Sequence, residues 1–171
     1  MGEGDKTVVM MVGVDPGLGG ALALLTGQGG LVEVWDMPVQ TKTHGKGNEV
    51  DPFMLGDILR EIESLADGQG VRATIERVAA MRGQGVTSVF SFGDSAGCVR
   101  AALGVMEIPT QFVLPTAWKK AAGLGKKDKG ASRTLATQCW PDRRDLFARV
   151  KDDGRAEAAL IAKHGLTRRG E

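Results

Sequence analysis

The sequence predicts an α/β fold with elements in the order βββαβαβα, on three observations. Residues 7–14 form a β-branched and Met-rich segment whose apolar residues are continuous rather than alternating, as expected of a central strand buried on both faces. From residue 51 onward, helical patterns alternate with short runs suited to strands. The 25 glycines stand mostly singly or in pairs between apolar runs and therefore indicate turns. A chain of 171 residues can bury one hydrophobic core, so we expect a single domain over residues 1–171.

The first part of the chain predicts three antiparallel strands. After the first strand, the turn sequence DPGLGG at 15–20 reverses the chain. Strands at 21–25 and 31–35 follow, joined by a glycine-rich hairpin turn at 27–30. The polar segment 41–49 is expected to be a loop.

The rest of the chain predicts two further strands among five helices. Asp51 is a suitable N-cap, with Pro52 at the first helical position. The apolar face of the helix that follows is predicted to contain Phe53, Leu55, Ile58, Leu59, Ile62 and Leu65. The predicted helices are 52–66, 88–105, 116–122, 131–139 and 153–164, and the predicted strands are 71–75 and 110–114.

Four acidic residues occupy positions that suit a metal site. Asp15 follows one apolar strand and Glu76 follows another. If these strands are parallel neighbours, both carboxylates lie at the carboxyl edge of the sheet, where α/β proteins usually bind ligands. Asp153 and Glu157 are four residues apart and so share one face of the last helix. Crowded carboxylates repel one another unless a cation joins them, and oxygen ligands favour Mg²⁺ or Mn²⁺ over zinc.

Each of these acidic residues also has a simpler interpretation. Asp15 precedes Pro-Gly, a common turn sequence, and Glu76 could pair with a neighbouring arginine. Asp153 could be a helix N-cap, and Glu157 could lie on a solvated helix face. The joint arrangement of the four favours the metal site.

Positive charge is concentrated in residues 118–149, although the net charge of the chain is only +1. Nine basic residues stand there against three acidic ones, a local net charge of +6. Such a segment suits a surface that binds phosphates, and it suits a solvated, salt-bridged face equally well.

Cys98 and Cys139 are far apart and show no paired metal spacing, which indicates reduced thiols. The longest apolar run, 8–14, is too short to cross a membrane, and no signal-peptide pattern is present. We therefore expect no membrane association and a cytoplasmic protein, in a bacterium or a phage-infected host cell.

Four stretches of the chain resemble RuvC-type Holliday junction resolvases. GVDPGLGGALALL (13–25) is similar to their first two strands, and IERVAAMRGQGVTSVFSFGDSAGCVRAAL (75–103) to their fourth strand and next helix. LPTAWKKAAGLGKKDKGAS (114–132) resembles their basic connection, and DDGRAEAALIAKHG (152–165) their last acidic helix. With Glu157 in place of the more usual Asp, AEAALIA is most similar to phage-encoded members.

The resemblance implies an RNase H-like mixed five-stranded sheet flanked by helices, a homodimer, and two-metal hydrolysis of DNA phosphodiesters at four-way or other branched junctions. By position, Asp15, Glu76 and Glu157 match catalytic metal-binding carboxylates. Asp153 is our choice for the fourth, because it shares the helical phase of Glu157, and Asp152 is the alternative. The implied cofactor is Mg²⁺, with Mn²⁺ as a substitute. Lys119 and Lys129 match basic positions that touch the scissile strand, and Lys129 is predicted to be catalytic.

On this interpretation, basic side chains would follow the phosphate backbones without reading sequence. They are Lys119, Lys120, Lys126, Lys127, Lys129, Arg133, Arg143 and Arg144. Cellular relatives usually carry an aromatic residue soon after the matching glutamate, and this chain has none there. Met81 or Arg82 would then act as the wedge at the junction centre, and we expect a broader range of branched substrates.

Small residues recur along the helix predicted at 88–105. Val89, Phe90, Gly93, Gly97, Ala101 and Gly104 lie close in helical phase. They either pack against the protein's own sheet or form a two-fold dimer contact.

Two other functions fit parts of the sequence. A non-catalytic junction-binding protein would have the same fold with a weakened site. An actin-like sugar kinase or other phosphotransferase could share the DPG turn, but the chain lacks the length for a second lobe and a later glycine-rich adenine motif.

Overall fold

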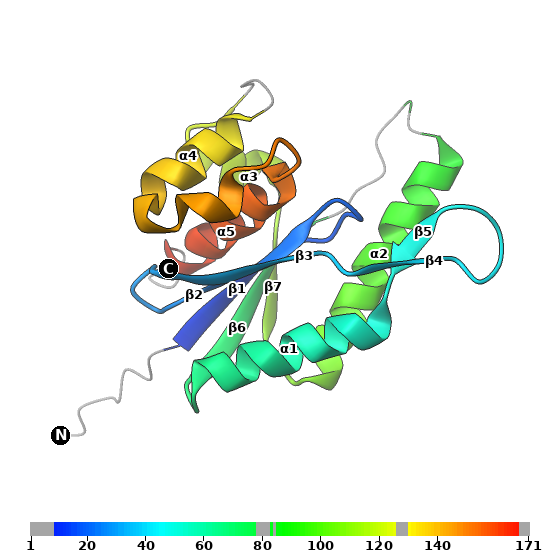
Figure 1. The fold of residues 1–171 in the computed structure, drawn as a ribbon, viewed down its shortest axis with the longest axis horizontal. Coiled ribbons are helices and arrows are strands. Elements are labelled where there is room, and N and C mark those ends of the chain that lie inside the picture. The colour runs from blue at the N-terminus through cyan, green and yellow to red at the C-terminus, as the bar shows by residue number, and fades with distance from the viewer. Residues whose placement is uncertain (1–8, 78–82, 84, 126–129, 168–171) are drawn as a thin grey trace.

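The computed structural model describes residues 9–77, 83, 85–125 and 130–167. A mixed five-stranded sheet forms its centre, in the order β3-β2-β1-β6-β7 (Figure 1). Its strands are β1 (Val9–Asp15), β2 (Ala21–Leu25), β3 (Leu31–Asp36), β6 (Gly70–Glu76) and β7 (Thr110–Val113). The mixed five-stranded sheet predicted from the sequence is confirmed.

The central strand of this sheet is β1, which runs antiparallel to β2 and parallel to β6. Residues 10–14 of β1 are buried, which explains why the strand is apolar at consecutive positions. Val14 pairs with Ile75, so the residues that follow them, Asp15 and Glu76, lie at the same edge of the sheet. The parallel neighbours that the sequence analysis required are present.

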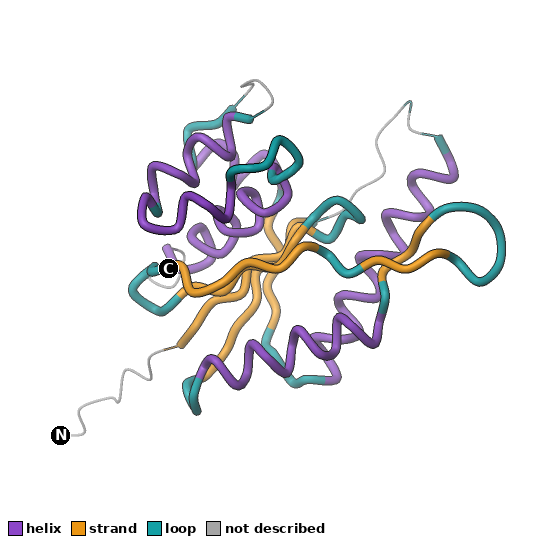
Figure 2. The backbone as a smooth tube through the Cα atoms, viewed as in Figure 1, coloured by secondary structure: helices purple, strands orange, loops and turns teal. Residues whose placement is uncertain are grey.

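Helices cover both faces of the sheet (Figures 1 and 2). One face is covered by α1 (Pro52–Ala66) and α2 (Val86–Val105), and one hydrophobic core lies between them and the strands. The other face is covered by α3 (Pro115–Ala121), α4 (Ala131–Cys139), the 3-10 helix Pro141–Phe147, which the sequence did not predict, and α5 (Asp153–Thr167). This layering explains why β1 and β2 are buried on both faces.

Helix α5 lies directly against the sheet because small residues line the contact. A side chain at Gly13 of β1 would collide with the backbone of α5 at Ala158 and Ala162. A side chain at Gly154 would collide with the backbone of the turn at Gly19 and Gly20. Backbone therefore touches backbone, and the helix that carries Glu157 is fixed to the strand that carries Asp15.

Helix α1 begins as predicted, because the Asp51 carboxylate accepts hydrogen bonds from the backbone N–H of Phe53 and Met54. The prediction that Phe53 and Leu65 belong to its buried face is wrong, since they are 82% and 42% exposed. The helix instead buries a narrower stripe, which consists of Leu55, Leu59, Ile62 and Ala66.

The segment 41–49 is not simply a loop. Val39–Thr41 (β4) and Asn48–Val50 (β5) pair as a short antiparallel ribbon beside α2. Gly45 and Gly47 adopt positive φ in the turn between them, and the Lys42 N–H donates to the Gly47 carbonyl. A ribbon of two three-residue strands with one strongly apolar residue in each carries too little pattern for the sequence to reveal it.

The described residues contain no helix that is both long enough and apolar enough to cross a membrane.

Candidate active site

Asp15 ends β1 and lies inside the turn that the sequence DPGLGG forms. The Gly17 N–H donates to Asp15 Oδ1 at 3.3 Å, and the Gly20 N–H donates to the Gly17 carbonyl at 2.9 Å. A side chain at Gly20 would collide with the backbone and carboxyl carbon of Asp15. The turn therefore closes around the carboxylate, which accounts for its glycines.

The pKa of Asp15 is raised from 3.8 to about 7. Desolvation by burial is the largest cause, and the negative charges of Glu76 and Glu157 add to it. The Gly17 N–H and the positive charge of Lys119 act in the opposite direction. Three carboxylates from β1, β6 and α5 are thus close enough for their charges to influence one another.

Glu76 ends β6 and accepts a hydrogen bond of 2.6 Å from the indole Nε1 of Trp118. Trp118 is fully buried in α3, immediately after β7. Burial raises the pKa of Glu76 and Glu157 adds to the rise, while the Trp118 hydrogen bond and the Lys119 charge oppose it. Trp118 could not be recognised as a functional residue from the sequence, because nothing in the local pattern shows where its N–H points.

Glu157 lies on α5 and is held by two polar contacts to its Oε1 atom. The Lys119 ammonium is 3.1 Å away, and the Ser132 hydroxyl donates to the same oxygen at 3.2 Å. Lys119 also lies over the Trp118 ring, 5.1 Å from its centroid. One lysine and one tryptophan of α3 therefore hold the two glutamates.

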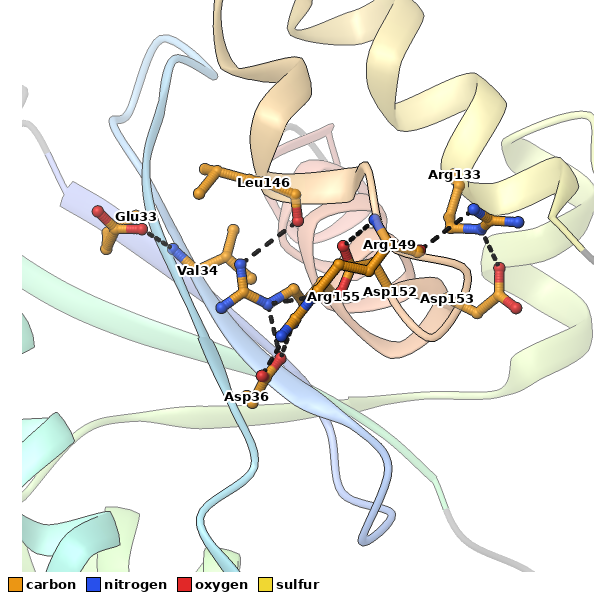
Figure 3. Close-up of polar contacts among 9 residues, drawn as sticks. All are labelled: Glu33, Val34, Asp36, Arg133, Leu146, Arg149, Asp152, Asp153 and Arg155. Atoms are coloured by element: carbon orange, nitrogen blue, oxygen red, sulfur yellow. Dashed lines mark hydrogen bonds and ion pairs between the residues drawn. The ribbon is translucent and has the colours of Figure 1, made fainter.

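The structure separates the two candidates for the fourth carboxylate (Figure 3). Asp152 is 1% exposed, and its oxygens accept from the Arg149 backbone N–H and from Arg149 Nε, both at 2.7 Å. Asp153 is partly exposed and pairs with Arg133 Nε at 3.0 Å. Asp152 is committed to internal contacts, so Asp153 is the better candidate ligand, although its carboxylate faces Arg133 in this structure.

An ionic network fixes the start of α5 to the end of β3 (Figure 3). Asp36 is paired with both Arg149 and Arg155, at 2.9 Å and 2.6 Å. Burial raises the pKa of Asp36, but hydrogen bonds from Arg155 and Arg149 outweigh it, so the pKa lies below its usual value. Arg149 connects Asp36 with Asp152, and the network therefore sets the position from which α5 begins.

The donor set fits a hard divalent cation, although the ligands are not assembled. All four candidates are carboxylates, which suits Mg²⁺ or Mn²⁺. Among the residues that the structure describes, no three His, Cys, Asp or Glu side chains come together closely enough to hold an ion. Glu76, Glu157 and Asp153 are instead turned toward Trp118, Lys119 and Arg133.

The predicted DNA-binding residues have different surroundings. Lys119 lies in the site, and Lys120 and Arg144 are exposed. Arg133 is paired with Asp153, and Arg143 donates to the Leu31 and Val32 carbonyls and to the Glu33 carboxylate of β3. Much of the charge in segment 118–149 thus forms internal pairs. Five predicted residues lie outside the described part of the chain: Met81, Arg82, Lys126, Lys127 and Lys129.

The small-residue stripe of α2 faces away from the sheet. Phe90 is 70% exposed, and a side chain added at Gly93, Gly97 or Gly104 would meet nothing within 4 Å. The buried face of α2 consists of Ser95, Val99 and Leu103. Packing of the stripe against the protein's own sheet, one of two interpretations of the sequence, is therefore wrong.

No protein-family model and no curated protein matches the sequence. The structure is similar to two solved structures of RuvC from Thermus thermophilus. RuvC in complex with Holliday junction substrate is 20% identical, with a TM-score of 0.63 over 94% of this chain and 95% of that chain. A second RuvC structure is 17% identical, with a TM-score of 0.52 over 94% and 96% of the two chains. The protein therefore has the RNase H-like α/β fold of these RuvC structures.

Proposed function

We propose that the protein is a metal-dependent endonuclease that cuts Holliday junctions and other branched DNA. The observation that carries this proposal is the electrostatic coupling of Asp15, Glu76 and Glu157, which come from three separate elements of a RuvC-like fold. Crowded carboxylates repel one another unless a cation lies between them. A site that binds divalent cations accounts for them.

Mg²⁺ would be held by Asp15, Glu76, Asp153 and Glu157, with Mn²⁺ able to replace it. Two such cations, when bound, supply an activated water and stabilise the leaving 3′ oxygen of the scissile phosphate. Asp15 is central, because it belongs to the middle strand and its turn is closed around it. Its raised pKa means that it loses its proton near neutral pH, when it becomes a charged ligand.

Lys119 has a second role in the proposed reaction. Its ammonium neutralises Glu157 in this structure, at a separation of 3.1 Å. If Glu157 held a cation instead, the Lys119 ammonium would be available to the scissile phosphate and to the negative charge that develops there. Lys129, outside the described residues, remains our proposal for a further catalytic cation.

We also propose a homodimer, assembled through the exposed stripe of α2. This face presents Phe90, Val105 and the neighbouring Phe112 of β7 to solvent at 70%, 83% and 50% exposure, with glycines between them that permit close approach. A four-way junction needs two cuts, and a two-fold dimer would supply two equivalent sites.

A non-catalytic junction-binding protein is the second candidate, and one observation favours it. The carboxylates of Glu157 and Asp153 are already neutralised by Lys119 and Arg133, so their charge is balanced without a metal. The phosphotransferase alternative has no comparable support in the structure.

Cleavage of a synthetic four-way junction in Mg²⁺ distinguishes the two candidates. We expect nicks near the junction centre that require Mg²⁺ or Mn²⁺ and are lost in Asp15→Asn, while Asp15→Asn still binds the junction. Binding without cleavage by the wild-type protein at every Mg²⁺ concentration would favour the non-catalytic candidate. Forks and flaps tested alongside measure substrate range, and cleavage confined to four-way junctions would contradict the broader range that we expect.

A further inference from the structure

A groove lined by both polar and apolar side chains lies on the opposite side of the Asp15 turn from α5. It has a volume of about 540 Å³ and is bounded by the β4–β5 ribbon and the first half of α2. We call it the ribbon groove. Leu18, from the turn that contains Asp15, lines the groove, and a side chain at Gly17 would contact the ring of Phe92 in α2. The groove therefore begins beside the candidate active site and leads away from it along α2, where Figure 1 shows the ribbon.

The side chains that line the ribbon groove are suited to phosphate. They include the cations Lys42 and Lys46 and the neutral donors Asn48, Thr87, Ser88 and Ser91. No carboxylate lines it among the described residues. Ammonium and hydroxyl groups are the usual protein donors to the phosphate oxygens of nucleic acids.

Lys42 and Lys46 also differ from most cations near the candidate active site. Within the described residues, neither lysine makes an ion pair. Arg133, Arg143 and Arg149, by contrast, are all paired with carboxylates. The positive charge of the ribbon groove is thus available to a ligand.

The acidic residues next to the ribbon do not compensate these lysines. Glu49 accepts a hydrogen bond of 3.2 Å from Gln40, and Asp51 caps α1. Neither residue lines the groove. Its charge is therefore complementary to an anion.

We propose that the ribbon groove binds the sugar–phosphate backbone of one DNA arm as that arm leaves the active site. This inference rests on the proposed function, because it assumes that branched DNA reaches Asp15. It places a DNA contact on the β4–β5 ribbon, which is separate in sequence from the basic segment 118–149. Backbone contacts of this kind position the substrate without selecting its sequence.

The test compares two double variants of the full chain that lose the same charge. Lys42→Ala/Lys46→Ala removes the groove cations. Arg60→Ala/Arg72→Ala removes two exposed cations from α1 and from the part of β6 distant from Glu76.

Binding of a fluorescent four-way junction is measured in EDTA at 50 to 200 mM KCl. The logarithm of the binding constant falls linearly with the logarithm of the salt concentration, and each phosphate contact adds about 0.9 to the steepness of this salt slope. The loss of two contacts should therefore make the slope of the groove variant less steep by about 1.8. Over this range wild type should lose about 12-fold more affinity than the groove variant.

Shortening the junction arms provides a second measurement. Once the arms no longer reach the groove, wild type should bind as weakly as the Lys42→Ala/Lys46→Ala variant, which shortening should affect little. The Arg60→Ala/Arg72→Ala variant should behave as wild type does throughout. Lys42→Arg/Lys46→Arg should retain the wild-type slope, because it keeps the charge.

The outcomes separate the groove from the proposed function. If wild type binds and cuts the junction but the groove variant keeps the wild-type salt slope, the groove inference is overturned and the function stands. If both double variants lose slope equally, the effect is one of net charge and the inference is again overturned. If wild type binds the junction without cutting it and only the groove variant loses slope, the groove is supported and catalysis fails. If wild type does not bind the junction, both fail.

Discussion

The carboxyl group of Asp15 is buried beside two other carboxylates, and its pKa of about 7 links folding to pH. In the unfolded chain the pKa is near 3.8, so between these values the folded protein holds a proton that the unfolded chain has lost. The stability that this proton contributes is complete below about pH 4 and is lost as pH rises through about 7. Acidic conditions should therefore stabilise the metal-free site relative to neutral ones.

We expect this dependence to appear in urea unfolding measured in EDTA from pH 5 to 8. Relative to Asp15→Asn, the wild-type protein should lose about 1.4 kcal/mol of unfolding free energy per pH unit up to about pH 7, and no more above it. Asp15→Asn is the control, because its amide does not titrate. A constant difference between the two proteins across this range would contradict the raised pKa.

Trp118 is a positioning residue in the proposed site, because its indole N–H holds Glu76 at 2.6 Å. Trp118→Phe should retain most of the buried ring and remove this donor. We expect about 10-fold slower junction cleavage, consistent with a hydrogen bond to a charged group worth about 1.5 kcal/mol, and a higher Mg²⁺ concentration for half-maximal rate. A purely structural role would lower the melting temperature and leave the Mg²⁺ requirement unchanged.

At the level of residues, the sequence was sufficient to propose the acidic groups but not their partners. Asp15, Glu76 and Glu157 could be proposed because they follow apolar strands or share a helix face. Trp118 and Ser132 contact them from α3 and α4, and such contacts depend on how helices pack across the sheet. The hydrogen bonds of Arg143 to β3 could not be predicted either, because they also depend on how the helices pack against the sheet.

Adjacent aspartates at the start of α5 should respond differently to substitution. Asp152→Asn should lower the unfolding free energy more than Asp153→Asn does, because the Asp152 carboxylate is buried and joins Arg149 to the network that includes Asp36. Asp153→Asn should change stability by less than about 1 kcal/mol, since its pair with Arg133 is partly exposed. Junction cleavage should nevertheless be lost in Asp153→Asn. Full activity in Asp153→Asn would remove this residue from the proposed ligands.

The contact between α5 and β1 should not tolerate one added carbon. Gly13→Ala would place a methyl group against the backbone of α5, and we expect a loss of at least about 2 kcal/mol of unfolding free energy. Gly56→Ala in α1 is the matched control, because it meets only the flexible end of Arg60. That variant should gain up to about 1 kcal/mol from better helix propensity. Equal effects in thermal unfolding would show that the close approach is not required.

Elements with a strong repeating pattern could be predicted, and those defined by pairing could not. The bounds of β2 and α1 agree with the sequence prediction, since apolar runs and an N-cap mark them clearly. The β4–β5 ribbon was missed because only Val39 and Val50 stand out from its polar surroundings. Its two strands are defined mainly by hydrogen bonds to each other.

The proposed dimer makes a prediction for the whole molecule. Phe90→Glu should give a monomer in sedimentation equilibrium, because a charge would enter the apolar stripe of α2. Phe53→Glu is the control, since Phe53 is 82% exposed on α1 and lies outside the stripe. On a cruciform plasmid the dimer should release linear DNA by paired nicks, whereas the monomer should leave nicked circles. Linear product from a monomeric Phe90→Glu protein would contradict coupled cleavage by two sites.

At the scale of the whole molecule, the sequence predicted the layers of the fold and the edge of the sheet that carries the acidic residues. It could not predict which surfaces remain open. Side-chain exposure on α2, and the position of Lys42 and Lys46 in the ribbon groove, follow from the way the helices and the ribbon pack on the sheet.

The direct contact of α5 with β1 has a consequence for how the proposed activity would be lost on heating. At Gly13 and Gly154 no side chain separates β1 and its turn from α5, so main-chain contact sets the distance between the strand that carries Asp15 and the helix that carries Glu157. Loosening of the cores elsewhere should leave that spacing intact. Nuclease activity should then persist until α5 detaches, and be lost at the same temperature as the sheet itself.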